Sequence, residues 1–255
     1  MAAANGGEPT IDALGQFKLY SLAGPLDFTQ SNLMMVVGAA LTLALLYFGM
    51  RPRAIVPGRL QAAAELAYKF IYDMCIDQVG PEGRKFFPFV FTLFFFVLMG
   101  NLLGIIPYSF TYTSHIAVTG ALALMVVVLV TIVAIRENGA RFFTEYFFPK
   151  GAPVALAPLI IPIEVISYLS RIVSLSVRLF ANMVAGHVMF AVFATFTILL
   201  ANSGMLGHVV GPAVGLLPIA VNIALVGFEL LVACLQAYVF AILTCIYLHD
   251  AVHLH

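Results

Sequence analysis

The sequence predicts an all-α polytopic membrane protein, with about five transmembrane helices and one amphipathic helix in a single membrane domain of residues 31–255. Three observations predict this class. Hydrophobic residues make up 62% of the chain and charged residues only 9%, whereas soluble domains carry about 25% charged residues. The apolar residues form uncharged runs, and a run of about 20 is enough to cross a bilayer. The twelve basic and twelve acidic residues cancel, so nothing suggests a nucleic-acid partner, and the apolar runs make a lipid bilayer the expected surrounding.

The first part of the chain contains one span and one amphipathic helix. Residues 1–30 are polar and mixed, and we expect them to form a separate N-terminal segment. The first span, residues 31–50, carries no charge and ends at a basic stretch. In residues 60–77 apolar side chains recur at helical spacing, while Glu65 and Lys69 lie four apart on another face. This pattern is typical of an amphipathic helix at the membrane surface or against a partner.

Two spans of ordinary length come next. They are predicted at residues 86–107 and 115–135, and neither contains Asp, Glu, Lys or Arg. Residues 108–114 between them are mostly hydroxyl-bearing and are predicted to form a polar turn. A charged stretch after residue 135 closes the second of these spans.

The last two apolar stretches, residues 158–200 and 213–248, are too long for upright spans. At about 1.5 Å per residue the first exceeds 60 Å, whereas the hydrocarbon core is about 30 Å thick. Residues 202–204 and 211–212 contain Gly, Asn, Ser and Pro and are predicted to break the chain between them. The two stretches therefore predict a long, steeply tilted hairpin.

The basic residues predict the orientation of the chain. They gather in the loop after the first span and in the loop after the third. By the positive-inside rule both loops face the cytoplasm or the mitochondrial matrix. With five spans, the N-terminus then lies outside and the C-terminus on the cytoplasmic or matrix side.

Charged residues inside the spans are few and regularly spaced. Within the predicted hairpin, Glu164, Arg171 and Arg178 are seven residues apart, and Asn182 follows four residues later. On a helix these four side chains share one face. A charge at bilayer depth costs about 2.5 to 3.5 kcal/mol on insertion scales, and such residues usually mark an ion path or a pair.

The last span carries a matching polar stripe. Asn222, Glu229 and Gln236 repeat every seven residues and so share one face. The two stripes either hold the helices together by hydrogen bonds or line a path for ions. His187 lies on the side opposite Arg178, where it is either a packing residue or a proton relay, since imidazole titrates near neutral pH.

Several of these residues belong to recognisable motifs. Residues 174–187, SLSVRLFANMVAGH, closely resemble the signature of the subunit a family of F-type ATP synthases. The resemblance spans most of the chain and includes GNLLGIIP at 100–107, Glu164, and LQAYVF at 235–240. The order of His187 before Glu229 is similar to mitochondrial and alphaproteobacterial members.

The resemblance implies proton translocation through the membrane sector of an ATP synthase. Members pass protons through two offset half-channels to and from a carboxylate on the rotating ring of c subunits, which couples proton flow to rotation and ATP synthesis. The implied partners are the c-ring, against which the tilted hairpin lies, the b subunits of the peripheral stalk, and the rest of the synthase. The implied location is the bacterial plasma membrane or the mitochondrial inner membrane.

The resemblance also implies residue roles. Arg178 matches the arginine that faces the c-ring carboxylate and prevents a direct leak. The remaining positions are implied to lie in or beside the half-channels. Glu229 and His187 are implied to form a polar pair, and Asn182 and Gln236 to lie beside the arginine. Glu164 is implied to lie in the half-channel towards the cytoplasm or matrix. Asn222 and Arg171 are placed in the half-channels without a more specific role.

Other functions fit the sequence less well. The chain has no Gly-rich loop followed by Lys and Ser or Thr, so nucleotide chemistry is expected on other subunits. No cofactor and no metal site are expected. A proton-coupled secondary transporter would show two related halves, which are not visible. A haem- or quinone-binding respiratory subunit would need facing histidines, for which His187 and His208 are the candidates.

Overall fold

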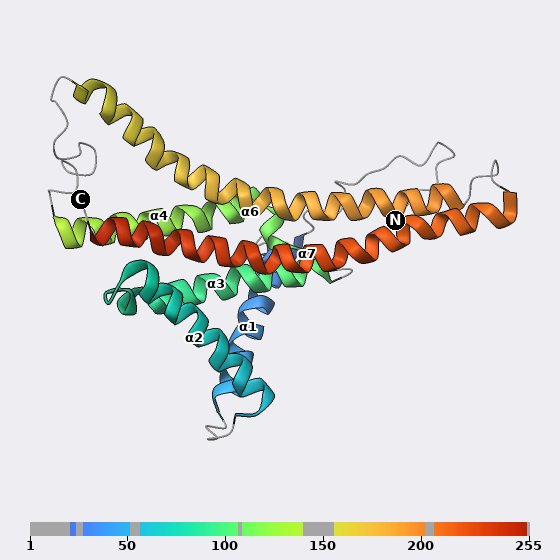
Figure 1. The fold of residues 1–255 in the computed structure, drawn as a ribbon, viewed down its shortest axis with the longest axis horizontal. Coiled ribbons are helices and arrows are strands. Elements are labelled where there is room, and N and C mark those ends of the chain that lie inside the picture. Colours follow the sequence, from blue (N-terminus) through green and yellow to red (C-terminus); the bar gives the residue numbers. More distant parts are fainter. Residues whose placement is uncertain are drawn as a thin grey trace.

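The computed structural model describes residues 21–23, 28–51, 57–106, 109–139, 156–201 and 207–253 (Figure 1). Helices dominate these ranges. In chain order the elements are β1 (Ser21–Ala23), β2 (Phe28–Thr29), α1 (Gln30–Met50), α2 (Arg59–Val79), α3 (Gly83–Ile105), the short 3₁₀ helix η3 (Tyr112–Ser114), α4 (Ile116–Asn138), α6 (Ala157–Ala201) and α7 (Gly207–Val252).

The predicted fold class is confirmed. Within the described ranges, α1, α3, α4, α6 and α7 are long and apolar enough to cross a membrane, which makes five candidate spans. The amphipathic helix is present as α2, in which Ile71 and Met74 are buried while Glu65, Lys69 and Asp73 are exposed. A small antiparallel pair of β1 and β2 before α1 was not predicted.

Two helix starts differ from the sequence prediction. α3 begins at Gly83 rather than at residue 86, after a tight turn in which Gly80 has a positive φ of 88°. The predicted helix began where the apolar run begins, but the charged residues before position 86 are also compatible with a helix. α7 begins at Gly207, so the helix runs through Pro212, where a break was predicted. Inside a helix proline removes one hydrogen bond and its ring crowds the carbonyl four residues earlier, but membrane helices tolerate it. The other predicted break, residues 202–204, lies outside the described residues.

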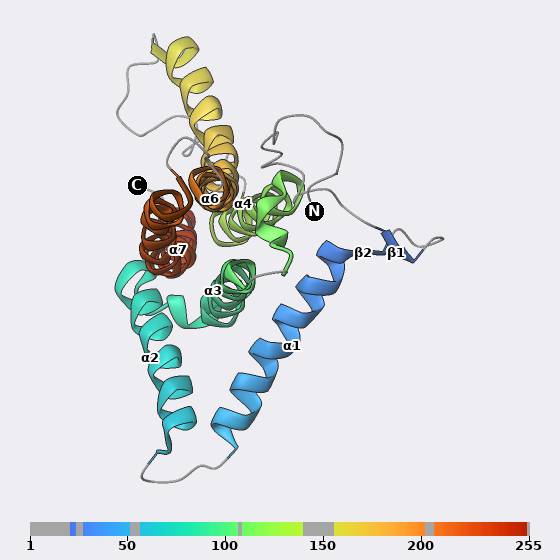
Figure 2. The same cartoon turned by 90° about the vertical axis from the view of Figure 1, so that its right-hand side faces the viewer.

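Four helices form one bundle from which α1 and α2 diverge. Figure 2 looks along α3, α4 and α7, with α1 and α2 running outward as the two arms of a V. In both views the second half of α6 follows α7, whereas its first part turns away. α1 runs steeply across the direction of the bundle.

The core lies between the bundle helices and one face of α2. Each of these five helices contributes a side chain with no exposed surface: Ile71 from α2, Val90 from α3, Val126 from α4, Leu179 from α6 and Phe240 from α7. α1 buries only small residues, Ser31, Gly38 and Gly49. The bundle therefore fixes α6 against α7, and these two helices carry all the predicted site residues.

Candidate functional site

Parts of the two polar stripes meet along the contact between α6 and α7, whereas Arg178 stays exposed. Three of the contacts between these helices show by their order that the helices are antiparallel. Going up α6, the contacting pairs are Arg171 with Asp250, Asn182 with Gln236, and Gly186 with Glu229. The sequence placed one polar stripe on each helix, and in the structure Asn182 of one stripe contacts Gln236 of the other.

Asn182 and Gln236 form a direct amide pair. The Asn182 Nδ2 donates to Gln236 Oε1 at 2.9 Å. Gln236 is buried, and its Nε2 has no hydrogen-bond partner within the described ranges. Buried amide groups nearly always bond to protein or to water, so this nitrogen is available to a water molecule.

Glu229 lies buried beside a small pocket. Neither of its carboxyl oxygens has a hydrogen-bond partner among the described residues. The carboxyl group packs against Gly186, where an added Cβ would lie 2.5 Å from Oε1. The adjoining pocket has a volume of about 200 Å³, and Asn182 and Phe228 are among its lining residues. A buried carboxyl group without a partner is costly unless it carries a proton or contacts water, so the site suits proton exchange.

His187 contacts a different element. Its Nε2 lies 2.8 Å from the Thr111 Oγ1, in the segment that joins α3 to α4. Because Glu229 has no hydrogen-bond partner in the described chain, the expected Glu229–His187 pair is not a direct hydrogen bond here. The reason is helical geometry: Gly186 faces Glu229, and the next residue is turned by about 100°. Their pairing within a half-channel stays a prediction.

Arg178 lies on the outer face of α6. The residue is exposed, and within the described ranges its guanidinium forms one long hydrogen bond, from Nη2 to Ser174 Oγ at 3.4 Å. No acid in the described ranges forms a salt bridge with it. Its neighbours on the exposed surface include Val173 and Val177. The arginine is therefore a cation on an apolar helix surface, with no carboxylate of the described chain to neutralise it.

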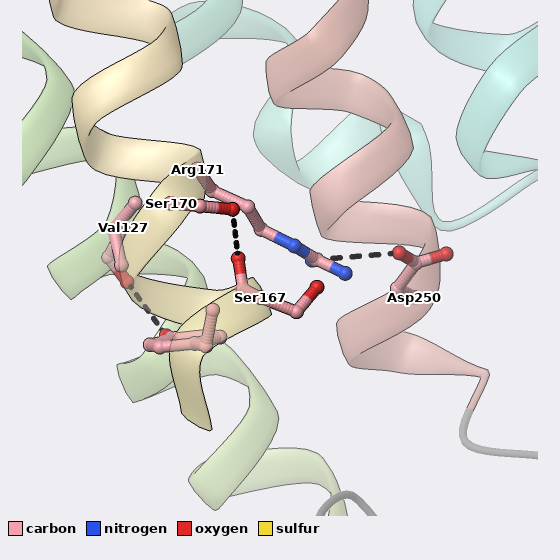
Figure 3. A network of polar contacts seen from close by, with 6 residues as sticks. Val127, Ser167, Ser170, Arg171 and Asp250 are labelled. Atoms are coloured by element: carbon pink, nitrogen blue, oxygen red, sulfur yellow. Dashed lines mark hydrogen bonds and ion pairs between the residues drawn. The ribbon is translucent and has the colours of Figure 1, made fainter. Parts of the chain in front are cut away.

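Arg171 differs from Arg178 because it has an acid partner. Its Nη1 lies 3.6 Å from Asp250 Oδ2, and its guanidinium stacks 4.8 Å from the centre of the Tyr247 ring. Figure 3 shows the arginine reaching from α6 across to α7. Asp250 was not predicted as a site residue, because the predicted span ended at residue 248. The signal was present: Asp250 continues the seven-residue repeat of Gln236.

The other two predicted positions lie towards opposite ends of the site. Glu164 is half-buried in the first part of α6 and forms no recorded bond to the described residues. Asn222 is half-buried in α7, and its Oδ1 lacks a hydrogen-bond partner within the described ranges. Asn222, Glu229 and Gln236 thus form a row of buried polar atoms without partners, about 21 Å long at 1.5 Å per residue. Such a row is rare in proteins unless water or a mobile proton visits it.

Comparison with known proteins agrees with the resemblance. The family described as "ATP synthase A chain" matches residues 32–249. "ATP synthase subunit a" of Granulibacter bethesdensis is 68% identical over 97% of this chain and 99% of its own length. The proteins of the same name from Gluconacetobacter diazotrophicus and Rhodospirillum rubrum are 64% and 51% identical, over 95% and 90% of this chain and 97% and 91% of their own lengths. These relatives are alphaproteobacterial, one of the two groups that the order of His187 and Glu229 resembles. The chain belongs to the ATP synthase subunit a family, the proton-translocating subunits in the membrane sector of F-type ATP synthases.

Proposed function

We propose that protons enter and leave a neighbouring c-ring through two offset half-channels in this chain, and that Arg178 separates the two. The proposal rests on one observation, the exposure of Arg178 on a membrane helix and its lack of an acid partner within the described ranges. A cation at this depth is costly, so a partner from outside the described chain is expected.

A c-ring carboxyl group is a suitable partner for physical reasons. In lipid it stays neutral, because burial disfavours the charged form, and beside a guanidinium it ionises. The guanidinium itself does not lose its proton in proteins. Arg178 therefore releases protons from the ring without carrying them across. A proton passes only when the ring turns, and each charge that crosses 100 mV supplies about 2.3 kcal/mol for rotation.

One half-channel follows the polar row on α7. Glu229 has two oxygens without partners beside a pocket, and Asn222 and Gln236 extend the row in both directions. Asn182 connects the row to the turn of α6 that follows Arg178. We assign Glu229 the role of proton carrier, and we assign the amides the role of holding water.

The other half-channel lies on the opposite side of Arg178 along α6. Glu164 and Arg171 precede Arg178 in the helix, whereas Asn182 and His187 follow it. We assign the Glu164 carboxylate the role of proton exchange with the cytoplasmic side. The Arg171–Asp250 salt bridge supports this half of the hairpin by joining it to the last turns of α7. Arg178 thus stands between the two routes.

The helix lengths support a tilted hairpin beside a round ring. α6 has 45 residues, or about 68 Å at 1.5 Å per residue, against a core of about 30 Å. α1 has 21 residues, which matches the core when the helix stands upright. Because α1 runs steeply across the bundle in Figure 1, an upright α1 places α6 and α7 at a steep tilt.

The remaining assignments follow the family. We propose that the chain is a non-catalytic subunit, that nucleotide chemistry belongs to other subunits, and that the b subunits of the peripheral stalk hold it against the ring. The bacterial relatives favour the plasma membrane of a bacterium. The distribution of basic residues favours an external N-terminus and a cytoplasmic C-terminus.

The Arg178→Ala variant tests the central role. In the assembled synthase it is expected to abolish ATP-driven proton pumping into inverted vesicles while the c-ring and b subunits still copurify. Lys69→Ala, which removes an exposed cation from α2, is the matched control and is expected to pump normally. Normal coupled pumping by Arg178→Ala would refute the proposal.

A further inference from the structure

The segment that joins α3 to α4 is polar in sequence but buried in the structure. Residues 110–114 all lie in the interior, and Tyr112 has no exposed surface. The sequence predicted a polar turn here. A buried segment of this composition requires partners for its hydroxyl groups, since each unsatisfied polar group costs free energy.

Hydrogen bonds fix this segment to two helices. The Tyr112 hydroxyl donates to the Phe96 carbonyl at 2.6 Å, and the Thr113 hydroxyl donates to Asn101 Oδ1 at 2.9 Å, both on α3. Asn101 in turn donates to the Ala233 carbonyl of α7 at 3.2 Å. These hydrogen bonds hold the segment against α3 and, through Asn101, against α7.

Two glycines of α3 make the close approach possible. A Cβ on Gly100 would lie 2.5 Å from the Tyr112 ring, and a Cβ on Gly104 would overlap the Thr111 side chain. Only glycine leaves room for backbone and side chain to approach so closely. Gly104 thus determines where the Thr111 hydroxyl lies.

We infer that Thr111 is a positioning residue for His187, and that its hydroxyl holds the imidazole ring in the orientation needed for proton exchange. The Thr111 Oγ1 lies 2.8 Å from His187 Nε2. A hydroxyl both donates and accepts, so it stays bonded whether Nε2 is protonated or not. A threonine at this place therefore holds the ring in both protonation states. A group that only donates or only accepts a hydrogen bond could hold it in one state alone.

This inference rests on the proposed role of His187 in a half-channel. It adds a residue from a third element, outside the α6–α7 hairpin. A methyl group in place of the hydroxyl removes the hydrogen bond while keeping the volume nearly constant, so Thr111→Val is the informative change. Thr111→Ser keeps the hydroxyl and removes only a methyl group.

The experiment is a double-mutant cycle in the whole synthase, read out as ATP-driven proton pumping per assembled complex. We expect Thr111→Val to lower pumping about fivefold, the size of one lost hydrogen bond, and Thr111→Ser to restore most of it. In a His187→Ala background, Thr111→Val is expected to cause no further loss, because the group it positions is absent.

Thr113→Val is the matched control, because it removes a buried hydroxyl from the same segment that bonds Asn101 and not His187. Any loss it causes is expected to be the same in the His187→Ala background. If Thr111→Val also loses pumping equally in both backgrounds, its role is structural and the inference fails. If His187→Ala lowers pumping and Thr111→Val does not, the inference fails while the role of His187 stands. If His187→Ala pumps normally, the half-channel role of His187 is refuted, and the inference about Thr111 that rests on it is refuted as well.

Discussion

The contact between Gly186 and Glu229 allows a sharp test of the α7 half-channel. A Cβ at position 186 would lie 2.5 Å from Glu229 Oε1 and 3.0 Å from its Cδ. The carboxyl group must then move by about 0.9 Å to reach the ordinary contact distance of 3.4 Å. Neither oxygen is held by a hydrogen bond in the described chain, so the group is free to shift into the adjoining pocket.

The shift is expected to affect transport more than stability. Overpacking a core usually costs about 1 to 3 kcal/mol, and a side chain that moves into existing space falls at the lower end of that range. Alanine also regains up to about 1 kcal/mol of helix propensity over glycine, so the net effect on folding is small. A displacement of 1 Å at a reacting group, by contrast, lowers rates by as much as about 100-fold.

We therefore expect Gly186→Ala to assemble normally and to lower ATP-driven pumping about tenfold or more. Gly120→Ala is the control, because its Cβ would lie 3.6 Å from Ser176 Oγ, an ordinary contact in the same bundle. Both variants add one methyl group to a membrane helix, so the comparison isolates the contact with Glu229. Equal pumping by the two variants would refute the reasoning that Glu229 has to stay where it is.

Further predictions concern the charged and titratable groups. Glu229→Gln is expected to lower passive proton conduction through membranes stripped of the catalytic sector. The effects of Glu229→Gln and His187→Ala are expected to be non-additive in the double variant, and full additivity would contradict a shared half-channel. Asp250→Asn is expected to lower the melting temperature of the solubilised complex slightly, because partly exposed salt bridges contribute about 1 kcal/mol or less. Arg171→Lys is expected to have a similar effect through the lost contact with Tyr247, and unchanged melting in both variants would contradict a supporting role.

The number and places of the helices could be predicted because charges are almost absent from the spans. A run without charges is visible in sequence alone, but its length did not reveal that α3 and α4 share the direction of α7 (Figure 2). The start of α7 could not be placed in the same way. Pro212 reads as a break, yet it lies inside α7, because membrane helices tolerate proline where soluble helices usually end.

The facing stripes were also visible in the sequence, because seven-residue spacing determines which side chains share a helix face. Their partners were not. Thr111 is 76 residues from His187 along the chain, and its polar neighbourhood resembles an exposed turn. Its burial depends on how closely two segments of the chain pack, which the sequence does not show. In the structure they pack so closely that any side chain at Gly104 would clash with Thr111.

Asp250 illustrates a different kind of miss. Its distance from Gln236 continues the repeat of the α7 stripe, so periodicity alone pointed to it. The hydropathy pattern instead predicted that the span ends before Asp250, because a charged residue normally ends a span. In the structure Asp250 forms a salt bridge with Arg171, and α7 continues to Val252.

A structure of the assembled membrane sector, with the c-ring in place, measures the decisive distance. The account predicts the Arg178 guanidinium within about 4 Å of a carboxyl group carried by the ring, the usual limit for an ion pair. It would be contradicted by a guanidinium that turns away from the ring and pairs with an acid of its own chain.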